Sequence, residues 1–162
     1  MIDENLGNTE ILKFENLEIS ATDFQILGPE VDVNINALSL LSKRDLVLEK
    51  LATRFRYTKE QMRFDSLLVK TKESSLKGNL RFDYEREDFR DFLNKVNLTA
   101  NFTESTVAFN EINAYYNEFG KDKIADFSTE ISGVLNDFLA SDLILLSDNT
   151  GVRGDYNFKN LF

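Results

Sequence analysis

The residues of this sequence best suited to chemistry are its carboxylates, which gather in short clusters. The clusters are Glu85 with Glu87 and Asp88, Asp83 with Glu85, and Asp122 with Asp126. A glycosidase needs two carboxylates held across a cleft, so that one acts as the acid and the other as base or nucleophile. Each cluster here falls in a predicted loop or on the polar side of a predicted strand. We therefore interpret these carboxylates as solvated surface.

The sequence contains no histidine and no cysteine, which removes most other catalytic groups. Zinc sites of the usual ligand types, thiol nucleophiles and Ser-His triads all need one of these two residues. The stretch SDNTG at 147–151 lacks the regular spacing of oxygen ligands in a calcium loop, and we predict a turn there. The triplets NLT and NFT, at Asn97 and Asn101, fit the glycosylation pattern, but more simply place Asn and Thr on an exposed strand face. We predict no enzyme, no cofactor and no metal.

The charge of the chain limits its partners. The formal net charge is −9 and the isoelectric point is near 4.6. A protein that binds nucleic acid needs a basic face for the phosphates, and none is visible. Binding to an anionic membrane surface is disfavoured for the same reason. Hydrophobic residues make up 42% of the chain and include 14 Phe but no Trp. This composition is typical of a folded chain with an apolar β surface.

Strict alternation of apolar and polar residues is the dominant pattern, and it predicts an all-β fold. In SSLKGNLRFDY, at 74–84, every second residue from Leu76 to Tyr84 is apolar or Gly. Similar stretches predict ten to thirteen strands, largely antiparallel, including two short strands around Asn16. A slip in the alternation at Leu67 and Leu68 suggests a bulge. Short helical turns are predicted at 85–95 and 111–120, the second with Gly120 as its stop.

A weak internal repeat runs through three of the predicted strands. The stretches SLKGNLRFDY, EISGVLNDF and GVRGDYNFKN each place a glycine between apolar residues, at Gly78, Gly133 and Gly154. Glycine within a strand usually marks a bulge, a bend or a close approach of another backbone. The repeat suggests a sheet assembled from similar units.

The apolar stripes of these strands have two interpretations. They form the core of a sandwich or a closed barrel, or they line an open, curled sheet that binds acyl chains. A period of 2 cannot separate these interpretations, because both bury one face.

The order of the segments favours the open sheet through a resemblance. The text LEISATDFQILGPEVDVNINALSLLSKRDLVLEKLATRFRYT, followed by MRFDSLLVKTKESSLKGNLRFDY and DFLNKVNLTANFTESTVAFNEINAYYNEFG, resembles the TamB-like branch of the AsmA-like proteins. The closest resemblance is to the large TamB homologues of the Bacteroidetes type, and it extends from about Glu10 to the end. The pattern rests on segment order and apolar positions, with no catalytic motif. One departure is the absence of a Gly near Asp45.

The resemblance implies a fold, a cellular location and a role. Such proteins are anchored in the inner membrane by an N-terminal helix and cross the periplasm as a β-taco, a curled sheet with an apolar groove. They are similar to bridge-like lipid-transfer proteins. The implied roles are phospholipid transport toward the outer membrane and help with outer-membrane protein insertion beside a barrel partner. Residues 1–162 would be one β-taco segment of a longer protein, without the anchor.

Under this reading the apolar groove binds phospholipid acyl chains through residues on at least four strands. The expected lining residues are Leu51, Phe55, Leu76, Leu80, Phe82, Val96, Leu98, Phe102, Phe127, Ile131 and Leu135. Gly78 and Gly133 would let the sheet curl. The alternative function is a chaperone or scaffold whose exposed strand edges pair with an unfolded outer-membrane β-barrel protein. Free edges would also allow an edge-to-edge homodimer.

Overall fold

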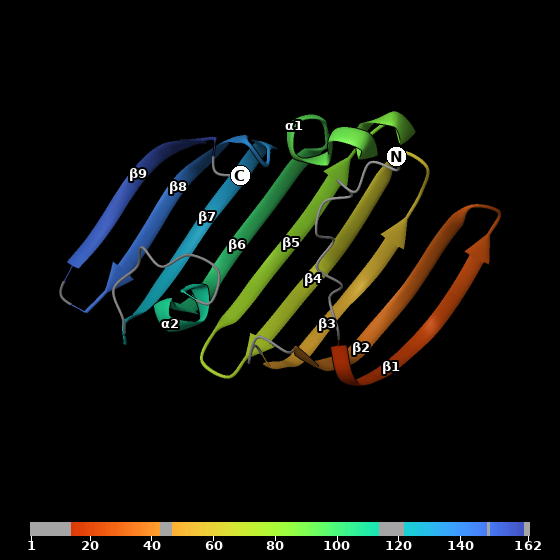
Figure 1. Ribbon diagram of the computed structural model, residues 1–162, viewed down its shortest axis with the longest axis horizontal. Helices are drawn as coiled ribbons and strands as arrows, with labels where there is room; N and C mark the ends of the chain where they lie inside the picture. Colours follow the sequence, from red (N-terminus) through yellow and green to blue (C-terminus); the bar gives the residue numbers. More distant parts are fainter. Residues whose placement is uncertain (1–13, 43–46, 114–121, 149, 161–162) are drawn as a thin grey trace, which may run out of the picture.

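The computed structural model describes residues 14–42, 47–113, 122–148 and 150–160, and these form one antiparallel sheet (Figure 1). Its nine strands lie side by side in the order in which they occur in the chain. The strands are β1 Phe14–Leu27, β2 Glu30–Ser42, β3 Val47–Tyr57, β4 Gln61–Thr71, β5 Ser75–Asp83, β6 Asn97–Ala108, β7 Ile124–Val134, β8 Asp137–Ser147 and β9 Thr150–Lys159. The predicted all-β, antiparallel fold is confirmed.

The sheet is a single, open layer that curls only slightly. Each strand pairs only with its sequence neighbours, so β1 and β9 are the two edges and no pairing among the described residues closes a barrel. Figure 1 shows no second sheet packed on this one. At about 4.8 Å between strands, nine strands extend on the order of 38 Å. Of the two interpretations that the apolar stripes left open, the structure has the open sheet.

Bulges lengthen the strands and account for the difference from the predicted strand number. The chain has a positive φ at Asn16, Asp23 and Glu104, and the pairing register shifts beside each of them. The predicted pair of strands around Asn16 is therefore one described strand, β1, and the two strands predicted between 96 and 112 merge into β6. A residue in the left-handed region breaks the alternation without ending the strand. The prediction of ten to thirteen strands was wrong for this reason.

The bulge predicted at Leu67 and Leu68 is confirmed one residue earlier. Ser66 has φ 52°, and the register of β4 against β5 shifts between Phe64 and Leu67. The Gly28-Pro29 turn and the loop at 58–61 are also present. In that loop, the Thr58 amide donates a hydrogen bond of 2.8 Å to the Gln61 carbonyl.

Short helices lie at both ends of the strands. The 3-10 helix η1, Arg86–Asp91, and α1, Phe92–Lys95, connect β5 to β6 and confirm the predicted helical interruption. The α2 helix, Phe109–Ile112, follows β6, while the rest of the second predicted helix, with Gly120, lies outside the described residues.

A carboxylate on α2 fastens this helix to the β4–β5 turn. Glu111 accepts hydrogen bonds from the Thr71 hydroxyl at 2.6 Å, from the Glu73 amide at 3.2 Å and from the Ser74 hydroxyl. The Ser74 hydroxyl in turn accepts a hydrogen bond of 3.0 Å from the Ala108 amide. Helix, turn and strand are thus connected through two acceptors, the Glu111 carboxylate and the Ser74 hydroxyl, which fix this end of the sheet.

Candidate lipid-binding face

One face of the sheet carries rows of apolar side chains that continue from strand to strand. Residues directly opposite each other in an antiparallel ladder point to the same face. One such row starts on β2 and ends on β9, as Val33, Phe55, Phe64, Leu80, Ala100, Ile131, Ala140 and Tyr156. A parallel row crosses all nine strands, as Ile26, Val31, Tyr57, Met62, Phe82, Leu98, Gly133, Phe138 and Phe158. We call the face that bears these rows the apolar face.

Aromatic rings hold the rows together across the strands. The ring centroids of Phe55 and Phe64 are 5.0 Å apart, and those of Phe64 and Phe82 are 6.5 Å apart. Phe82 also contacts Phe92 of α1 at 5.7 Å. These separations lie in the range of favourable aromatic pairs. The short helix therefore covers one end of the apolar face.

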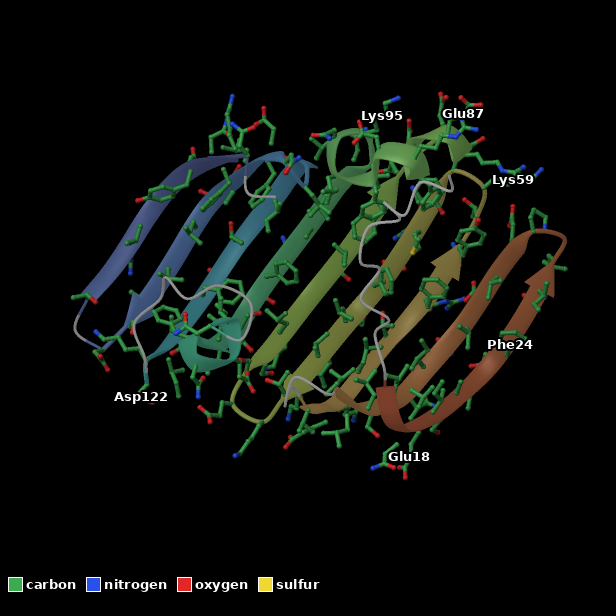
Figure 2. All side chains as sticks on the ribbon, viewed as in Figure 1. Glu18, Phe24, Lys59, Glu87, Lys95 and Asp122 are labelled. Atoms are coloured by element: carbon green, nitrogen blue, oxygen red, sulfur yellow. The ribbon has the colours of Figure 1, made fainter. Side chains whose placement is uncertain are left out.

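The covering of the apolar face decreases toward the edge strands. Leu98 and Ala100 in the middle are only 7% and 3% exposed. Ile26 on β1 is 57% exposed and Tyr156 on β9 is 38% exposed. Phe24, labelled on β1 in Figure 2, is exposed as well. The exposed apolar side chains of this face are thus concentrated toward its two edge strands, and exposed apolar patches mark interaction sites.

The opposite face is polar over β2 to β5. Asp32 accepts hydrogen bonds from the guanidinium groups of Arg54, at 3.2 Å, and Arg56, at 2.9 Å. The hydrogen bond from Arg54, followed by that from Arg56, lowers the pKa of Asp32 below its usual value. On β8 the polar face also carries Leu139, Ile144 and Leu146, which are partly exposed. The contrast between the two faces is thus sharpest in the first half of the sheet.

Nine of the eleven residues predicted to line the groove lie together on the apolar face. They are Leu51, Phe55, Leu76, Leu80, Phe82, Leu98, Phe102, Phe127 and Ile131. Val96 lies between α1 and β6 and is 1% exposed, so it packs inside the protein. Leu135 lies in the turn between β7 and β8. These two residues precede or follow a strand, where alternation no longer decides the direction of a side chain.

The sequence-based set of lining residues missed much of β4, β8 and β9. Phe64, Val69, Leu145 and Phe158 share the apolar face with the predicted residues. On β4 the bulge shifts the alternation, and on β8 the run LILL is apolar on both faces, so neither strand shows one clear stripe. Allowing one extra residue in β4 would have found Val69, and the regular alternation of β9 already marks Phe158.

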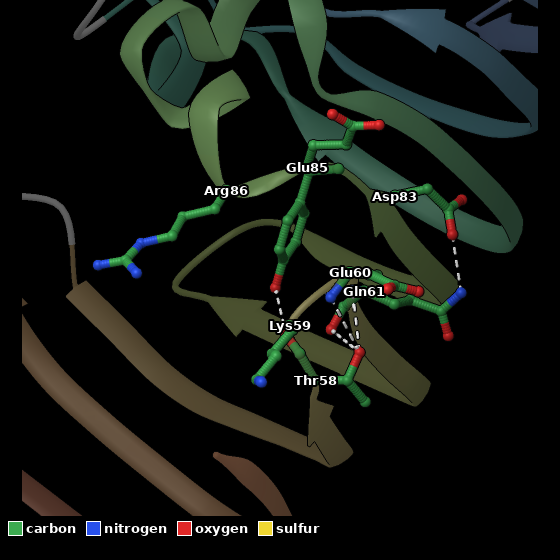
Figure 3. Close-up of a pocket in the computed structure, with 8 residues that line it drawn as sticks. Thr58, Lys59, Glu60, Gln61, Asp83, Glu85 and Arg86 are labelled. Carbon is green, nitrogen blue, oxygen red and sulfur yellow. Dashed lines mark hydrogen bonds between the residues drawn. The ribbon is translucent and has the colours of Figure 1, made fainter.

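A hollow of about 740 Å³ lies at one end of the strands and not on the apolar face (Figure 3). It is a shallow depression at the β3–β4 turn. Charged and polar side chains dominate its lining, which comprises Thr58, Lys59, Glu60, Gln61, Asp83, Tyr84, Glu85 and Arg86. Mixed charges of this kind do not suit an acyl chain, so size alone does not make this hollow the candidate site.

Tyr84, one of the residues that line this depression, forms two hydrogen bonds to the β3–β4 turn. Its hydroxyl donates a hydrogen bond of 3.1 Å to the Thr58 carbonyl, and its amide donates one of 2.9 Å to the Glu60 carbonyl. Burial, with a smaller contribution from the neighbouring Tyr57, raises the pKa of Tyr84 to about 12. Tyr84 therefore stays uncharged and connects the end of β5 to the β3–β4 turn through these hydrogen bonds.

Comparison with known proteins finds no matching family model, no matching curated protein and no matching solved structure. Among the described residues, no helix has the length and apolar character needed to cross a membrane. The same residues contain no group of three or more acidic side chains placed to hold a metal ion. The fold thus defines a class, single-layer antiparallel β proteins with one apolar face, and that face is the candidate site.

Proposed function

We propose that the apolar face binds the acyl chains of phospholipids, and that the chain is a segment of a TamB-like, periplasmic lipid-transfer protein. One observation supports this most: apolar rows run across the sheet, and no second layer of described residues covers them. A hydrocarbon chain that lies across these rows, parallel to the strands, removes apolar area from water on both partners. The sheet then serves as a surface along which lipid moves between the inner and outer membranes.

The energetics favour transport over storage. Each methylene removed from water contributes about 0.8 kcal/mol, so fourteen methylenes would contribute roughly 11 kcal/mol if fully covered. An open sheet covers one side of the chain, so about half of this, roughly 5 kcal/mol, is available before the entropic cost of binding. An acyl chain bound with this free energy can dissociate again from any part of the apolar face. Reversibility suits a carrier, which must release what it binds.

The distribution of charge leaves room for the lipid headgroup. In Figure 2 the labelled charged residues Lys59, Glu87 and Lys95 lie at one end of the strands, while Glu18 and Asp122 lie at the other. The rows between these ends are apolar. A headgroup can stay in water at the end of the strands, so no specific polar pocket is required.

Mass spectrometry of the chain purified without harsh detergent tests the proposal. Phospholipid should co-purify under native conditions, and added phospholipid should displace a fluorescent fatty acid. Bovine serum albumin, as a positive control, and a lipid-free β protein of similar charge would calibrate both readouts. If no phospholipid co-purifies and none competes with the fluorescent probe, the apolar face does not bind lipid and the proposal fails.

A scaffold for folding outer-membrane β-barrel proteins is the second candidate. The observation in its favour is that β1 and β9 both present an edge with no strand partner among the described residues. An unfolded barrel strand could pair with such an edge through backbone hydrogen bonds. The two candidates use different parts of the sheet, so Phe82→Glu or Phe102→Glu should impair lipid binding and spare strand pairing.

A further inference from the structure

The sheet contains the same three-strand unit twice, with a constant separation of 76 positions. Strands β3 to β5 correspond to β7 to β9. Thr53 and Thr129, both buried, occupy the same place, and each hydroxyl donates to a carbonyl on the next strand. The acceptors are Asp65 at 2.9 Å and Ser141 at 3.0 Å, which are again 76 positions apart.

A second pair of contacts extends the correspondence to β5 and β9. Ser66 and Asp142 are the bulge residues, with φ of 52° and 48°. The amide of each donates a hydrogen bond of 2.9 Å to a side chain on the following strand, Asn79 in the first unit and Asp155 in the second. A glycine, Gly78 or Gly154, precedes the acceptor in both units. Strand β9 is therefore the structural counterpart of β5.

The two counterparts differ in what lies beside them. Strand β5 pairs with β6, and Gly78 lies opposite Phe102. A Cβ atom on Gly78 would lie 2.0 Å from the Asn101 carbonyl oxygen, so the approach of β6 requires glycine. At Gly154, whose φ of 136° itself favours glycine, the nearest atom to such a Cβ would be Tyr156 Cε2, at 3.7 Å, and no atom of a neighbouring strand comes within 4 Å. The space that a neighbouring backbone fills beside β5 is open beside β9.

The charges along the two strands show the same difference. Lys77 of β5 forms an ion pair with Glu104 of β6, at 3.4 Å. Its counterpart is Arg153, which forms no ion pair with any residue that the structure describes. On the apolar face, Tyr156 and Val152 of β9 are about 40% exposed, whereas Leu80 and Leu76 of β5 are half-buried. Strand β9 thus presents open positions for backbone, charge and apolar contacts.

We propose that the free edge of β9 binds an antiparallel strand from another polypeptide segment with the residue pattern of β6. The pattern is an aromatic residue opposite Gly154, an acidic residue beside Arg153, and apolar residues opposite Tyr156 and Phe158. The contact would continue, one unit further, the β5–β6 interface that the molecule already contains. A second folded copy does not meet this description, because its own β6 is paired on both sides by β5 and β7.

The proposal concerns the edge of the sheet and does not depend on lipid binding to its face. A peptide with the sequence of β6, Asn97–Ala108, is the probe, and the whole chain labelled with nitrogen-15 is the receptor. Amide hydrogen exchange should slow at every second residue of β9 between 151 and 159, since alternate amides of a strand point to each side. Amides of β1 should keep their exchange rates.

Variants of the peptide and of the chain test the pattern. The Phe102→Glu peptide should bind at least tenfold more weakly than the parent. The Glu104→Lys peptide should bind about two- to fivefold more weakly, as expected for an exposed ion pair. The Arg153→Glu chain should reverse this preference and bind the Glu104→Lys peptide better. Arg153 is exposed, so this change leaves the fold intact.

Three outcomes would overturn the proposal. The first is unchanged exchange in β9 at millimolar peptide. The second is protection in β5 or β7 in place of β9, which would mean that the peptide replaces the chain's own β6. The third is protection of β9 that grows with protein concentration alone and accompanies dimers in light scattering, which would make a second copy the occupant. Lipid loading would stay the same in all three cases, so this result is separable from the proposed function.

Discussion

Two neighbouring residues of β8 provide a direct test of the apolar face. Leu145 lies opposite Phe127 and Val152 and points to the apolar face, whereas Ile144 lies opposite Ser128 and Arg153 and points to the other. Replacing either residue by glutamate removes one aliphatic side chain and adds one negative charge on the same strand. The two variants therefore differ only in the face that they alter.

The expected difference in lipid affinity follows from the lost contact. If a bound acyl chain loses cover over about two methylenes at Leu145, at about 0.8 kcal/mol each, binding weakens by about 1.6 kcal/mol. This corresponds to slightly more than a tenfold rise in Kd, since about 1.4 kcal/mol is a factor of ten. A carboxylate beside the chain adds a desolvation cost that increases the effect. Ile144→Glu should leave the Kd within twofold of the parent.

Displacement of a fluorescent fatty acid by phospholipid measures both Kd values, and circular dichroism checks that each variant is folded. Leu145 is half-buried, so Val152→Glu supplies a second variant on the same face at a residue that is 41% exposed. The reasoning is refuted if Leu145→Glu and Val152→Glu bind lipid as the parent does. It is equally refuted if Ile144→Glu weakens binding as much as they do.

Three further predictions concern the contacts that hold the sheet. Because the pKa of Tyr84 is raised in the folded state, this tyrosine ionises at a lower pH in the unfolded state. The free energy of unfolding should therefore fall as the pH rises from about 10 toward about 12. In urea titrations at several pH values, Tyr84→Phe should remove part of this pH dependence. An absorbance titration at high pH should show one of the five tyrosines ionising late. Glu111→Gln weakens the hydrogen bonds that join α2 to the β4–β5 turn and should lower the free energy of unfolding by about 1–3 kcal/mol, whereas an equal stability of the variant would contradict that role. Asn79→Ala and Asp155→Ala each remove the side chain that accepts a hydrogen bond from a bulge amide. Each should lower the free energy of unfolding, measured with denaturant, by about 1 kcal/mol. A large difference between the two values would argue against the equivalence of the two three-strand units.

The strand content could be predicted from the alternation, and the antiparallel pairing from the hairpin-length gaps between the strands. In β5 every apolar residue from Leu76 to Phe82 falls on one face, as the period of 2 requires. The number of strands could not, because Asn16 and Glu104 adopt left-handed conformations that interrupt the pattern inside a continuous strand. Polar residues that tolerate this conformation look like loop residues in a sequence.

The internal repeat was visible in the sequence, but one of its three glycines, Gly133, was wrongly included. Gly78 and Gly154 are equivalent, whereas Gly133 corresponds to Tyr57, beside the turn between its strand and the next. The contacts that define the repeat lie elsewhere, in the threonine hydroxyls and in the side chains of Asn79 and Asp155. Those contacts join residues more than ten positions apart, so no local pattern of sequence reveals them.

The bulges also explain how one face stays apolar over strands of eleven or twelve residues. Inserting one residue in a strand would move every later side chain to the opposite face. Phe64 and Leu67 are three positions apart, yet both point to the apolar face, because Ser66 in the left-handed region absorbs the extra residue. The same spacing of three recurs at Phe102 and Ser105 in β6 and at Ala140 and Leu143 in β8.

Each bulge residue in these three strands, Ser66, Glu104 or Asp142, is polar and exposed. The polar residue at each bulge is therefore kept away from the apolar face, and the rows on either side of it remain in line. A strand without its bulge would present alternating apolar and charged segments to a bound chain. The left-handed residues in β4, β6 and β8 are thus what makes the apolar face continuous, and a continuous face is the property that the proposed lipid binding requires.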